Sequence, residues 1–212
     1  RLQEQDKLLL KARIDALSSQ INPHFLFNTL ASISSLIRTK PETARMLIFK
    51  LSAILRRRLR SQDHFIPLRE ELASLDEYLD IEVVRFGSQL IVEKQLQPDM
   101  LDVLVPSMIL QPLIENSIKH GIAPKIGGGR VVIRTRRGNG RVIIEIDDNG
   151  LGMSDERLGS SMTDGIGLSN VHERLRVIYG ANFAMTLTSE PGRGTVARIE
   201  LPVAPPPDRV IS

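Results

Sequence analysis

The sequence predicts an α+β protein in which a helical region is followed by a mixed sheet with helices on one face. Two observations predict this class: apolar residues recur at helical spacing up to about residue 86, and strand-like runs, mostly arranged as hairpins, begin after Gly87. The chain has 212 residues, which suffice for one large or two ordinary domains. We expect a helical region at residues 1–86, a second domain at 87–204 and a tail at 205–212.

The composition, 42% hydrophobic and 25% charged, is typical of a globular protein. A formal net charge of +3 is too small to indicate binding to nucleic acid, and the absence of cysteine excludes disulfides and thiolate metal sites. No apolar run approaches the roughly 18 residues that span a membrane. Because the chain begins at Arg1 inside an amphipathic pattern, we expect it to be a fragment that continues a preceding helix.

The helical region is predicted to contain a hairpin of two amphipathic helices and then a third helix. An apolar seam precedes Pro23 and resumes behind it; its members are Leu10, Ile14, Leu17, Ile21, Leu26, Leu30, Ile33 and Ile37. Pro41 suits the first turn of the second helix. Two helices cannot bury such a stripe alone, so we expect dimerisation into a four-helix bundle. Pro67 opens the third helix, which runs to about Phe86.

The second domain is predicted to contain five strands and two helices. The expected strands are 89–96, 130–136, 141–147, 183–188 and 195–201, and the expected helices run from Pro106 to a Gly121 cap and over 168–179. The Gly-Asn-Gly run at 138–140 is a specific signal for a hairpin. The stretch 149–165 is rich in glycine and serine and longer than most connections, which is typical of a mobile lid.

The run of residues 20–28 places a proline and a histidine together inside a helical pattern. Proline in a helix interior removes a hydrogen bond and clashes one turn back, at a cost of roughly 3 kcal/mol. Either the bend at Pro23 presents the His24 ring for chemistry, or His24 is a packing residue among apolar neighbours. The segment alone is compatible with both interpretations.

Residues 115–120 form the first of three segments in the second domain that carry recognisable chemistry. Asn116 and Lys119 are one helical turn apart, with His120 beside them. An amide oxygen, an ammonium group and an imidazole on one face suit a magnesium-bound polyphosphate, because Mg2+ prefers oxygen ligands and lysine meets phosphate as a point charge. A solvated helix face is the alternative interpretation.

The other two segments follow at 147–152 and 164–168. Asp148, directly after a strand, suits acceptance of a hydrogen bond from an exocyclic amine, and the glycines behind it let the backbone approach a flat ring. A tight turn capped by aspartate is the alternative. Gly165 and Gly167 precede a helix and create an anion site, although their spacing matches neither the dinucleotide fingerprint nor the P-loop.

In this order the segments resemble the GHKL superfamily of ATP-binding domains and, more closely, the LytS/YehU-type sensor histidine kinases. The resemblance covers nearly the whole chain. Its motifs are residues 20–28, 78–86 with Glu82 and Arg85, 105–106, 111–121, 148–153, 165–175 and 192–195. The resemblance implies an α/β sandwich of the Bergerat type that binds ATP and Mg2+ and follows a helical dimerisation region.

The resemblance also implies roles for polar residues around the nucleotide. Asn116 is expected to hold the Mg2+ that bridges the phosphates, with Lys119 and His120 facing the phosphates or the ribose. Asp148 is expected to bind the adenine amino group, helped by Thr195 through a water molecule. These roles suit phosphoryl transfer, which depends mainly on positioning and charge neutralisation.

Loops and the phosphoryl acceptor complete the site that the resemblance implies. The loop residues are Gly150 and Gly152 on the base side and Gly165, Gly167 and Leu168 on the phosphate side. Residues 153–164 are expected to form the mobile lid. The resemblance implies that His24 receives the γ-phosphoryl group, a role that suits a neutral imidazole as a competent nucleophile.

Two departures from the family pattern matter. ATPase branches of the superfamily carry a glutamate four residues before the magnesium asparagine, where this chain has Pro112, so phosphotransfer is favoured over simple ATP hydrolysis. Many histidine kinases carry an acidic residue directly after the phosphorylated histidine, where this chain has Phe25. The base for the imidazole proton is therefore open. Asn28, one turn on, either orients the ring or a water or is a surface residue, and Glu115 is a candidate base.

The sequence thus predicts the kinase portion of a homodimer that autophosphorylates His24 with Mg-ATP and passes the phosphoryl group to a response-regulator aspartate. The resemblance implies a membrane anchor in a preceding N-terminal part and a cytoplasmic location for this portion. The alternative is a dimeric switch that binds nucleotide without autophosphorylation, which the missing acidic neighbour of His24 favours. ATP hydrolysis coupled to motion is a third possibility, which Pro112 disfavours.

Overall fold

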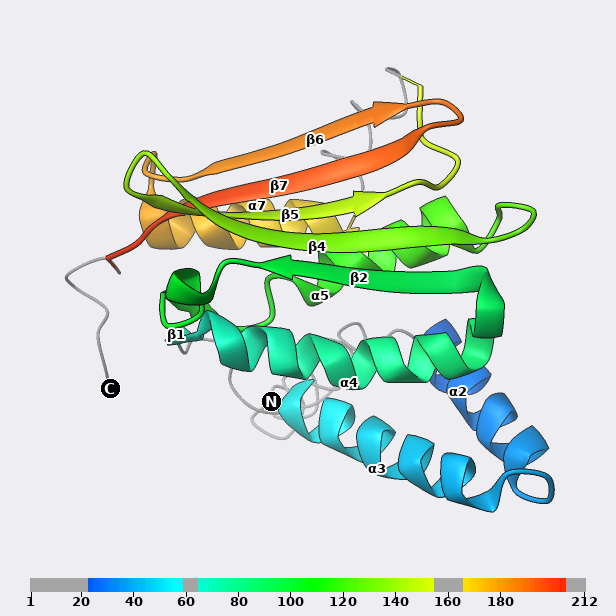
Figure 1. Ribbon diagram of the computed structural model, residues 1–212. Coiled ribbons are helices and arrows are strands. Elements are labelled where there is room, and N and C mark those ends of the chain that lie inside the picture. Colours follow the sequence, from blue (N-terminus) through cyan, green and yellow to red (C-terminus); the bar gives the residue numbers. More distant parts are fainter. Residues whose placement is uncertain (1–22, 59–64, 155–165, 205–212) are drawn as a thin grey trace, which may run out of the picture. The chain divides into compact units, whose positions relative to one another are not determined.

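The computed structural model describes residues 23–58, 65–154 and 166–204 (Figure 1). The chain forms two compact units, Arg1–Gln62 and Asp63–Ser212. The sequence places the end of the helical region after residue 86, whereas the third helix packs on the sheet and lies in the second unit. The predicted boundary between the functional domains, after residue 86, remains a prediction. None of the described helices is long and apolar enough to cross a membrane.

The first unit contains the expected helical hairpin. Helix α2 spans Pro23–Leu36 and α3 spans Pro41–Arg58, and the two helices contact each other. The turn between them closes with the Lys40 N–H donating to the Leu36 carbonyl at 2.8 Å. Large apolar side chains are exposed on and beside both helices: Phe27, Leu30, Ile37, Ile48 and Phe49. The part of the seam that precedes Pro23 lies outside the described residues.

The second unit is built on a five-stranded mixed sheet with strand order β2-β4-β5-β7-β6. Its strands are β2 Leu90–Leu96, β4 Gly129–Gly138, β5 Arg141–Asp148, β6 Ala184–Glu190 and β7 Gly194–Pro202. β2 runs parallel to β4, and the other neighbours are antiparallel. A separate short sheet pairs β1 (Phe65–Pro67) with β3 (Leu104–Pro106).

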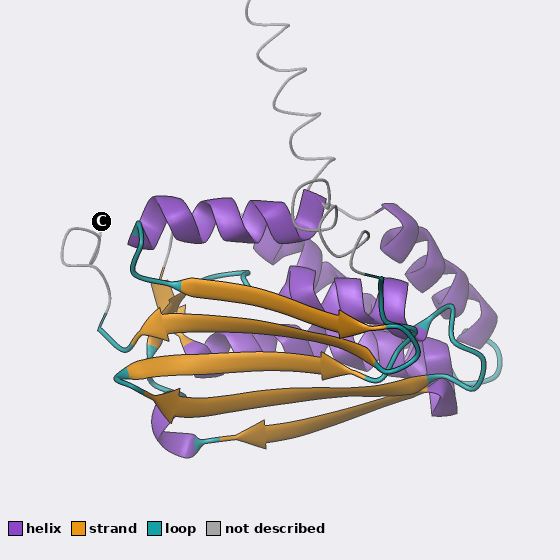
Figure 2. Cartoon of the chain, turned by 90° about the horizontal axis from the view of Figure 1, so that it is seen from above, coloured by secondary structure: helices purple, strands orange, loops and turns teal. Residues whose placement is uncertain are grey.

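The described α-helices of the second unit lie on one face of the five-stranded sheet, as Figures 1 and 2 show. They are α4 (Leu68–Phe86), α5 (Gln111–Asn116) and α7 (Ile166–Tyr179). α4 contacts β2, and α5 contacts α7. Buried aliphatic side chains from both layers form the core, among them Leu75, Leu79, Leu113, Ile133, Ile144, Leu175 and Ile199. The predicted α+β class, a mixed sheet with helices on one face, is confirmed.

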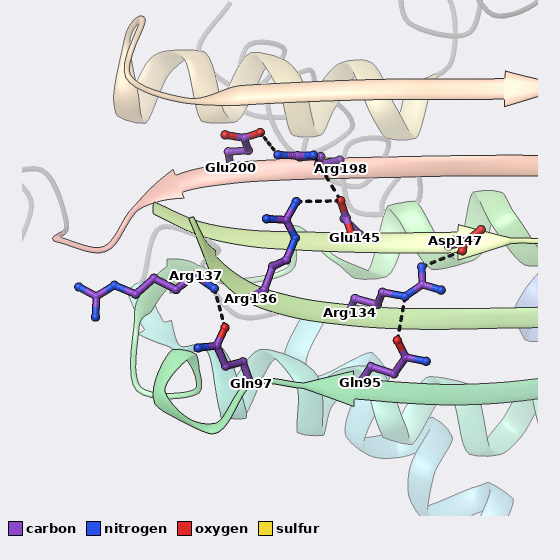
Figure 3. A network of polar contacts seen from close by, with 9 residues as sticks. All are labelled: Gln95, Gln97, Arg134, Arg136, Arg137, Glu145, Asp147, Arg198 and Glu200. Carbon is purple, nitrogen blue, oxygen red and sulfur yellow. Dashed lines mark hydrogen bonds and ion pairs between the residues drawn. The ribbon is translucent and has the colours of Figure 1, made fainter. Parts of the chain in front are cut away.

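The opposite face of the sheet carries a network of charged and polar side chains (Figure 3). Glu145 lies at its centre: its Oε1 is 3.6 Å from Arg136 Nη2 and 3.5 Å from Arg198 Nη1. Arg134 Nη1 donates to Asp147 Oδ2 at 2.7 Å. Cross-strand pairs of this kind stabilise a sheet by only about 0.2–1 kcal/mol each. The network therefore contributes little to stability and mainly makes this face polar. Because side chains alternate along a strand, the buried apolar residues of the same strands point to the other face, toward the helices.

The hairpin predicted from residues 138–140 is confirmed. β4 and β5 pair as far as Gly138 opposite Arg141, which leaves Asn139 and Gly140 as a two-residue loop. Both loop residues have positive φ, 50° and 72°, as a type I′ turn requires. Asparagine and glycine tolerate this region better than other residues, which explains why the signal is specific.

The helix predicted from Pro106 to Gly121 is wrong at both ends. Pro106 ends β3, where it pairs with Phe65 of β1, so α5 begins only at Gln111. After Asn116 the chain continues as a π-helical turn, Ser117–Ile122, and Gly121 lies inside this turn instead of capping a helix. The apolar pattern did not reveal either change, because strand pairing and a widened helical turn both depend on distant partners.

Candidate functional site

Asp148 ends β5 and is buried where the sheet meets the π-helical turn, with 2% of the residue exposed. Its Oδ1 accepts the Gly150 N–H at 2.9 Å, and the carboxylate also accepts hydrogen bonds from the Ser117 side chain and the Thr195 backbone. Burial raises the pKa of Asp148, and these hydrogen bonds oppose the shift. A carboxylate offers about four acceptor positions. Asp148 therefore caps its own turn, as expected for the alternative of a tight turn capped by aspartate. Its carboxylate can still accept a hydrogen bond from one more donor.

The glycines at 150 and 152 are required by the packing of the backbone around this carboxylate. A Cβ atom at Gly150 would lie 2.4 Å from the Cα of Gly121, and one at Gly121 would lie 2.7 Å from Asp148 Oδ1. Gly152 has a φ of +65°, and a Cβ there would lie 1.9 Å from the Glu190 carbonyl oxygen. The loop after β5 thus closes tightly onto the π-helical turn, and only glycine leaves room for that approach.

Thr195 lies beside Asp148 because the two residues are register partners of β7 and β5. The Thr195 hydroxyl is 2.8 Å from Ser189 Oγ, which also accepts the Met153 N–H at 2.8 Å. Ser189, which the motifs did not single out, ties the end of β6 to the start of the expected lid. No sequence motif marks Ser189; its role follows from its place opposite Thr195 in the β6–β7 register.

Asn116, Lys119 and His120 lie on the segment that carries α5 into the π-helical turn. Asn116 is half-buried, and Lys119 and His120 are exposed, which also fits the alternative of a solvated helix face. Partial burial of the ring and then the positive charge of Lys119 lower the pKa of His120, so its imidazole is neutral at neutral pH. Turns of the π type occur frequently at functional sites.

Mg2+ is compatible with these side chains. Among the described residues, no three or more His, Cys, Asp or Glu side chains gather as a protein-built metal cage would require. An ion held by the Asn116 oxygen together with phosphate oxygens and waters needs no such cage, because Mg2+ keeps several waters and prefers oxygen ligands. Lys119 adds a positive charge for the phosphates one turn further on.

The start of α7 lies against α5. A Cβ atom at Gly167 would be 3.7 Å from the Cβ of Pro112, an ordinary contact. Leu168 is 3% exposed, so its side chain packs in the core. Gly165 and residues 155–164 of the expected lid lie outside the described residues.

His24 and Asn28 lie together on α2 in the first unit. Asn28 Nδ2 is 3.3 Å from both ring nitrogens of His24. His24 is exposed, whereas Phe25 is 6% exposed and packs inward. The exposure of the ring argues against the packing interpretation, and the amide contact is the one that a ring-orienting Asn28 would make.

Glu82 is a fully buried carboxylate on α4. Its Oε2 forms an ion pair with Arg85, and its Oε1 has no hydrogen-bond partner among the described residues. Burial raises the pKa of Glu82 to about 7, with the Arg85 charge opposing and the Glu115 charge adding to the shift. Glu115 in turn accepts a hydrogen bond from Gln111 Nε2 at 2.9 Å. The position of Glu82, three residues after Leu79 on the apolar stripe, was the available signal of its burial.

Glu82 is expected to make stability depend on pH. Its folded pKa is raised above the unfolded value, so its contribution is fully present below about pH 4.5 and is lost as pH rises through about 7. Glu82→Gln mimics the protonated side chain and should remove this dependence. Relative to the variant, we expect wild type to lose on the order of 2 kcal/mol of unfolding free energy between about pH 5 and 8.

Urea unfolding of both proteins across this pH range measures the difference. The exposed Glu70→Gln, two turns or more away on the same helix, is the control and should follow wild type. Parallel stability curves for wild type and Glu82→Gln would show that Glu82 is ionised throughout.

Two family models match the chain. One, described as histidine kinase, matches residues 12–90. The other, described as histidine kinase-, DNA gyrase B-, and HSP90-like ATPase, matches residues 102–205. The first range includes His24, and the second includes Asn116, Asp148 and Thr195.

Curated relatives match over most of this chain. The chain is 41% identical over 186 residues to the sensor histidine kinase YpdA of Escherichia coli, covering 85% of this chain and 33% of the relative. It is 34% identical over 200 residues to the sensor histidine kinase BtsS of Escherichia coli, covering 94% and 35%. It is 36% identical over 207 residues to the sensor protein LytS of Bacillus anthracis, covering 93% and 35%. The chain thus spans about a third of the length of these relatives.

Solved structures share the fold. The histidine kinase AdeS of Acinetobacter baumannii matches with a TM-score of 0.52 and 17% identity, covering 92% of this chain and 96% of that one. The histidine kinase domain of a blue-light activated histidine kinase from Erythrobacter litoralis matches with a TM-score of 0.50 and 15% identity, covering 94% of both chains.

Proposed function

The chain belongs to the sensor histidine kinases of the GHKL superfamily, and we propose that it binds Mg-ATP, autophosphorylates His24 and passes the phosphoryl group to a response-regulator aspartate. The observation that carries the proposal is the buried Asp148, which is hydrogen-bonded to the turn that follows Asn116. A carboxylate in this position has an acceptor to offer to an adenine amino group, next to the oxygen and the cation that suit a magnesium-bound polyphosphate.

In this proposal the second unit binds and orients the nucleotide. Asp148 accepts a hydrogen bond from the adenine amino group, and Thr195 assists through a water. Asn116 would hold Mg2+, which when bound neutralises part of the phosphate charge. Lys119 meets the phosphates as a point charge, and the neutral His120 donates or accepts a hydrogen bond at the phosphates or ribose.

The first unit supplies the nucleophile. A ring nitrogen of His24 forms a bond to the γ-phosphorus while the bond from that phosphorus to the ADP oxygen breaks, and the imidazole proton leaves to a base. Asn28 orients the ring with its amide, 3.3 Å from the ring nitrogens, but an amide is not a base. Glu115, held by Gln111, is our candidate for that base.

A second copy of the chain is the partner that the hairpin needs. Phe27 and Phe49 are 69% and 65% exposed, and further apolar side chains are exposed on and beside the same helices. Packing two hairpins into a four-helix bundle would bury these residues. By family resemblance we also propose a preceding membrane anchor, a cytoplasmic location for this portion, and a receiver domain as the partner that accepts the phosphoryl group.

A nucleotide-binding switch without autophosphorylation is the second candidate. The observation that favours it is that the residue after His24 is the buried Phe25 and not a carboxylate. ATP hydrolysis has less support, because the position one turn before Asn116 is Pro112, which has no group that activates water.

Incubation of the chain with Mg2+ and γ-labelled ATP distinguishes the three functions. Acid-labile label on the protein is expected for the kinase, together with ATP binding. Binding without any label would instead support the switch. Sustained phosphate release that does not depend on His24 would support hydrolysis.

A further inference from the structure

Glu71 is a buried carboxylate that the proposed reaction does not use. It lies in the first turn of α4 and is 3% exposed. Its Oε2 accepts the Met108 N–H at 2.7 Å, its Oε1 accepts the Leu110 N–H at 2.9 Å, and the Ile109 backbone also hydrogen-bonds to it. One side chain of α4 therefore holds three successive backbone groups of the segment 107–110.

The segment 107–110 needs such a partner. Met108 has a φ of 59°, in the left-handed region that costs free energy for a residue with a Cβ atom. α5 begins directly after this turn, and its N-cap residue Leu110 makes no side-chain cap hydrogen bond. Glu71 thus supplies from α4 an acceptor that a cap residue normally supplies from within the chain. The same hydrogen bonds from Glu71 favour the left-handed conformation of Met108.

Arg174 of α7 is fixed on the same turn. Its Nη1 donates to the Ser107 carbonyl at 2.5 Å. Burial raises the pKa of Glu71, while the backbone hydrogen bonds and the charge of Arg174 oppose the shift. Three helices therefore meet at residues 107–110: α4 through Glu71, α7 through Arg174, and α5, which starts there.

The chain enters the second unit beside this turn. β1 pairs with β3 in the register Phe65 to Pro106, and the Leu68 N–H donates to the Val103 carbonyl at 2.9 Å. The segment that leads into α4 is thus hydrogen-bonded to the segment that leads into α5. A displacement of the start of α4 would therefore also shift the start of α5, because these hydrogen bonds connect the two segments.

We propose that Glu71 is a positioning residue for the nucleotide site, because it fixes the turn from which α5 presents Asn116 and to which α7 is tied. The inference rests on the proposed function for the identity of the ligand. The far end of the α5 segment is held separately, since the Leu151 N–H donates to the Gly121 carbonyl at 3.1 Å. Loosening the near end therefore displaces Asn116 more than it displaces the surroundings of Asp148.

Glu71→Gln tests the proposal in the ligand-free chain. Glutamine fills the same volume but replaces one acceptor oxygen by an amino group, which confronts the N–H groups of the turn with a donor. We expect amide hydrogen exchange at Met108, at Leu110 and through α5 to become about ten- to a hundredfold faster. Exchange near Arg174 should also accelerate, and exchange in β5 and β7 should not. Glu70→Gln, exposed on the same helical turn, is the matched control and should change none of these rates.

Met108→Gly separates positioning from packing. Glycine adopts positive φ without the Cβ penalty, so adding this change to Glu71→Gln should restore most of the lost protection in α5. A Glu71 that merely fills the core would not be rescued by a change in a backbone turn. Absence of rescue, or wild-type exchange rates in α5 and α7 of Glu71→Gln, would overturn the proposal.

Calorimetry with Mg-ATP and with adenosine gives a second readout. Glu71→Gln should bind Mg-ATP about tenfold more weakly, because Asn116 is displaced, while its affinity for adenosine changes by less than about twofold. Equal losses for both ligands would contradict a role in positioning Asn116. If wild type binds neither ligand, the proposed function fails, and the exchange rates alone decide whether Glu71 positions α5 and α7.

Discussion

Replacing His24 by glutamine is expected to abolish labelling of the chain by γ-labelled ATP. Glutamine is polar and of similar size, but its amide nitrogen is not a nucleophile, so no bond to phosphorus can form. His24 is exposed on α2, so its replacement leaves no cavity in the core and the fold should be unchanged. Loss of label would then report the chemistry of the ring. Label on the protein is measured after denaturation, with its lability in acid as the sign of a phosphohistidine.

Two controls make the His24 result specific. His172→Gln removes a different histidine, whose ring contacts Phe183 with centroids 5.4 Å apart, and should label like wild type. ATP affinity of His24→Gln should equal that of wild type, since the nucleotide residues lie in the second unit. Equal acid-labile labelling of wild type and His24→Gln would overturn the assignment of His24 as the phosphoryl acceptor.

Replacing Asp148 by asparagine is expected to weaken ATP binding by about 1.5–3 kcal/mol, or roughly ten- to a hundredfold. The variant loses the charge of an acceptor and turns one oxygen into a donor that faces the adenine amino group. Because burial raises the pKa of Asp148, acidification should weaken binding to wild type in the same direction by protonating the carboxylate. Calorimetric titration with Mg-ATP measures both effects.

A matched variant and a matched ligand isolate the adenine contact. Asp147→Asn changes the neighbouring residue, whose side chain pairs with Arg134 on the other face of the sheet, and should leave ATP affinity unchanged (Figure 3). A purine nucleoside triphosphate with a hydrogen atom in place of the 6-amino group should bind wild type and Asp148→Asn about equally. If ATP binds both proteins with the same affinity, Asp148 does not contact the adenine amino group.

Local features of the fold could be predicted from the sequence. The turn at Asn139 and Gly140 depends only on which residues tolerate positive φ, and that is a property of each residue alone. The extent of α4 follows from a regular apolar period between a proline and a glycine. Pro106 was assigned to the wrong element, because its pairing with Phe65 joins segments about forty residues apart.

The candidate site was only partly visible in the sequence. Its motifs point to Asn116 and Asp148, and the structure brings Asp148 next to the turn that follows Asn116. The motifs contain Ser117 and Glu82 but assign no role to either. Their roles depend on contacts that the residue spacing in the sequence does not show. Ser117 hydrogen-bonds to Asp148, and Glu82 forms an ion pair with Arg85 in the protein interior.

The amino-acid sequence was sufficient to predict the class of fold, the hairpin turn and the residue types that suit a nucleotide and a phosphoryl acceptor, because these depend on local conformation and on side-chain chemistry. Which charged residues are buried depends instead on how distant segments pack together. Glu71 and Glu82 are acidic residues on a helix whose surroundings come from other segments, and those surroundings set their hydrogen bonds and their pKa. Burial and long-range pairing are properties of the assembled fold, so no local pattern contains them.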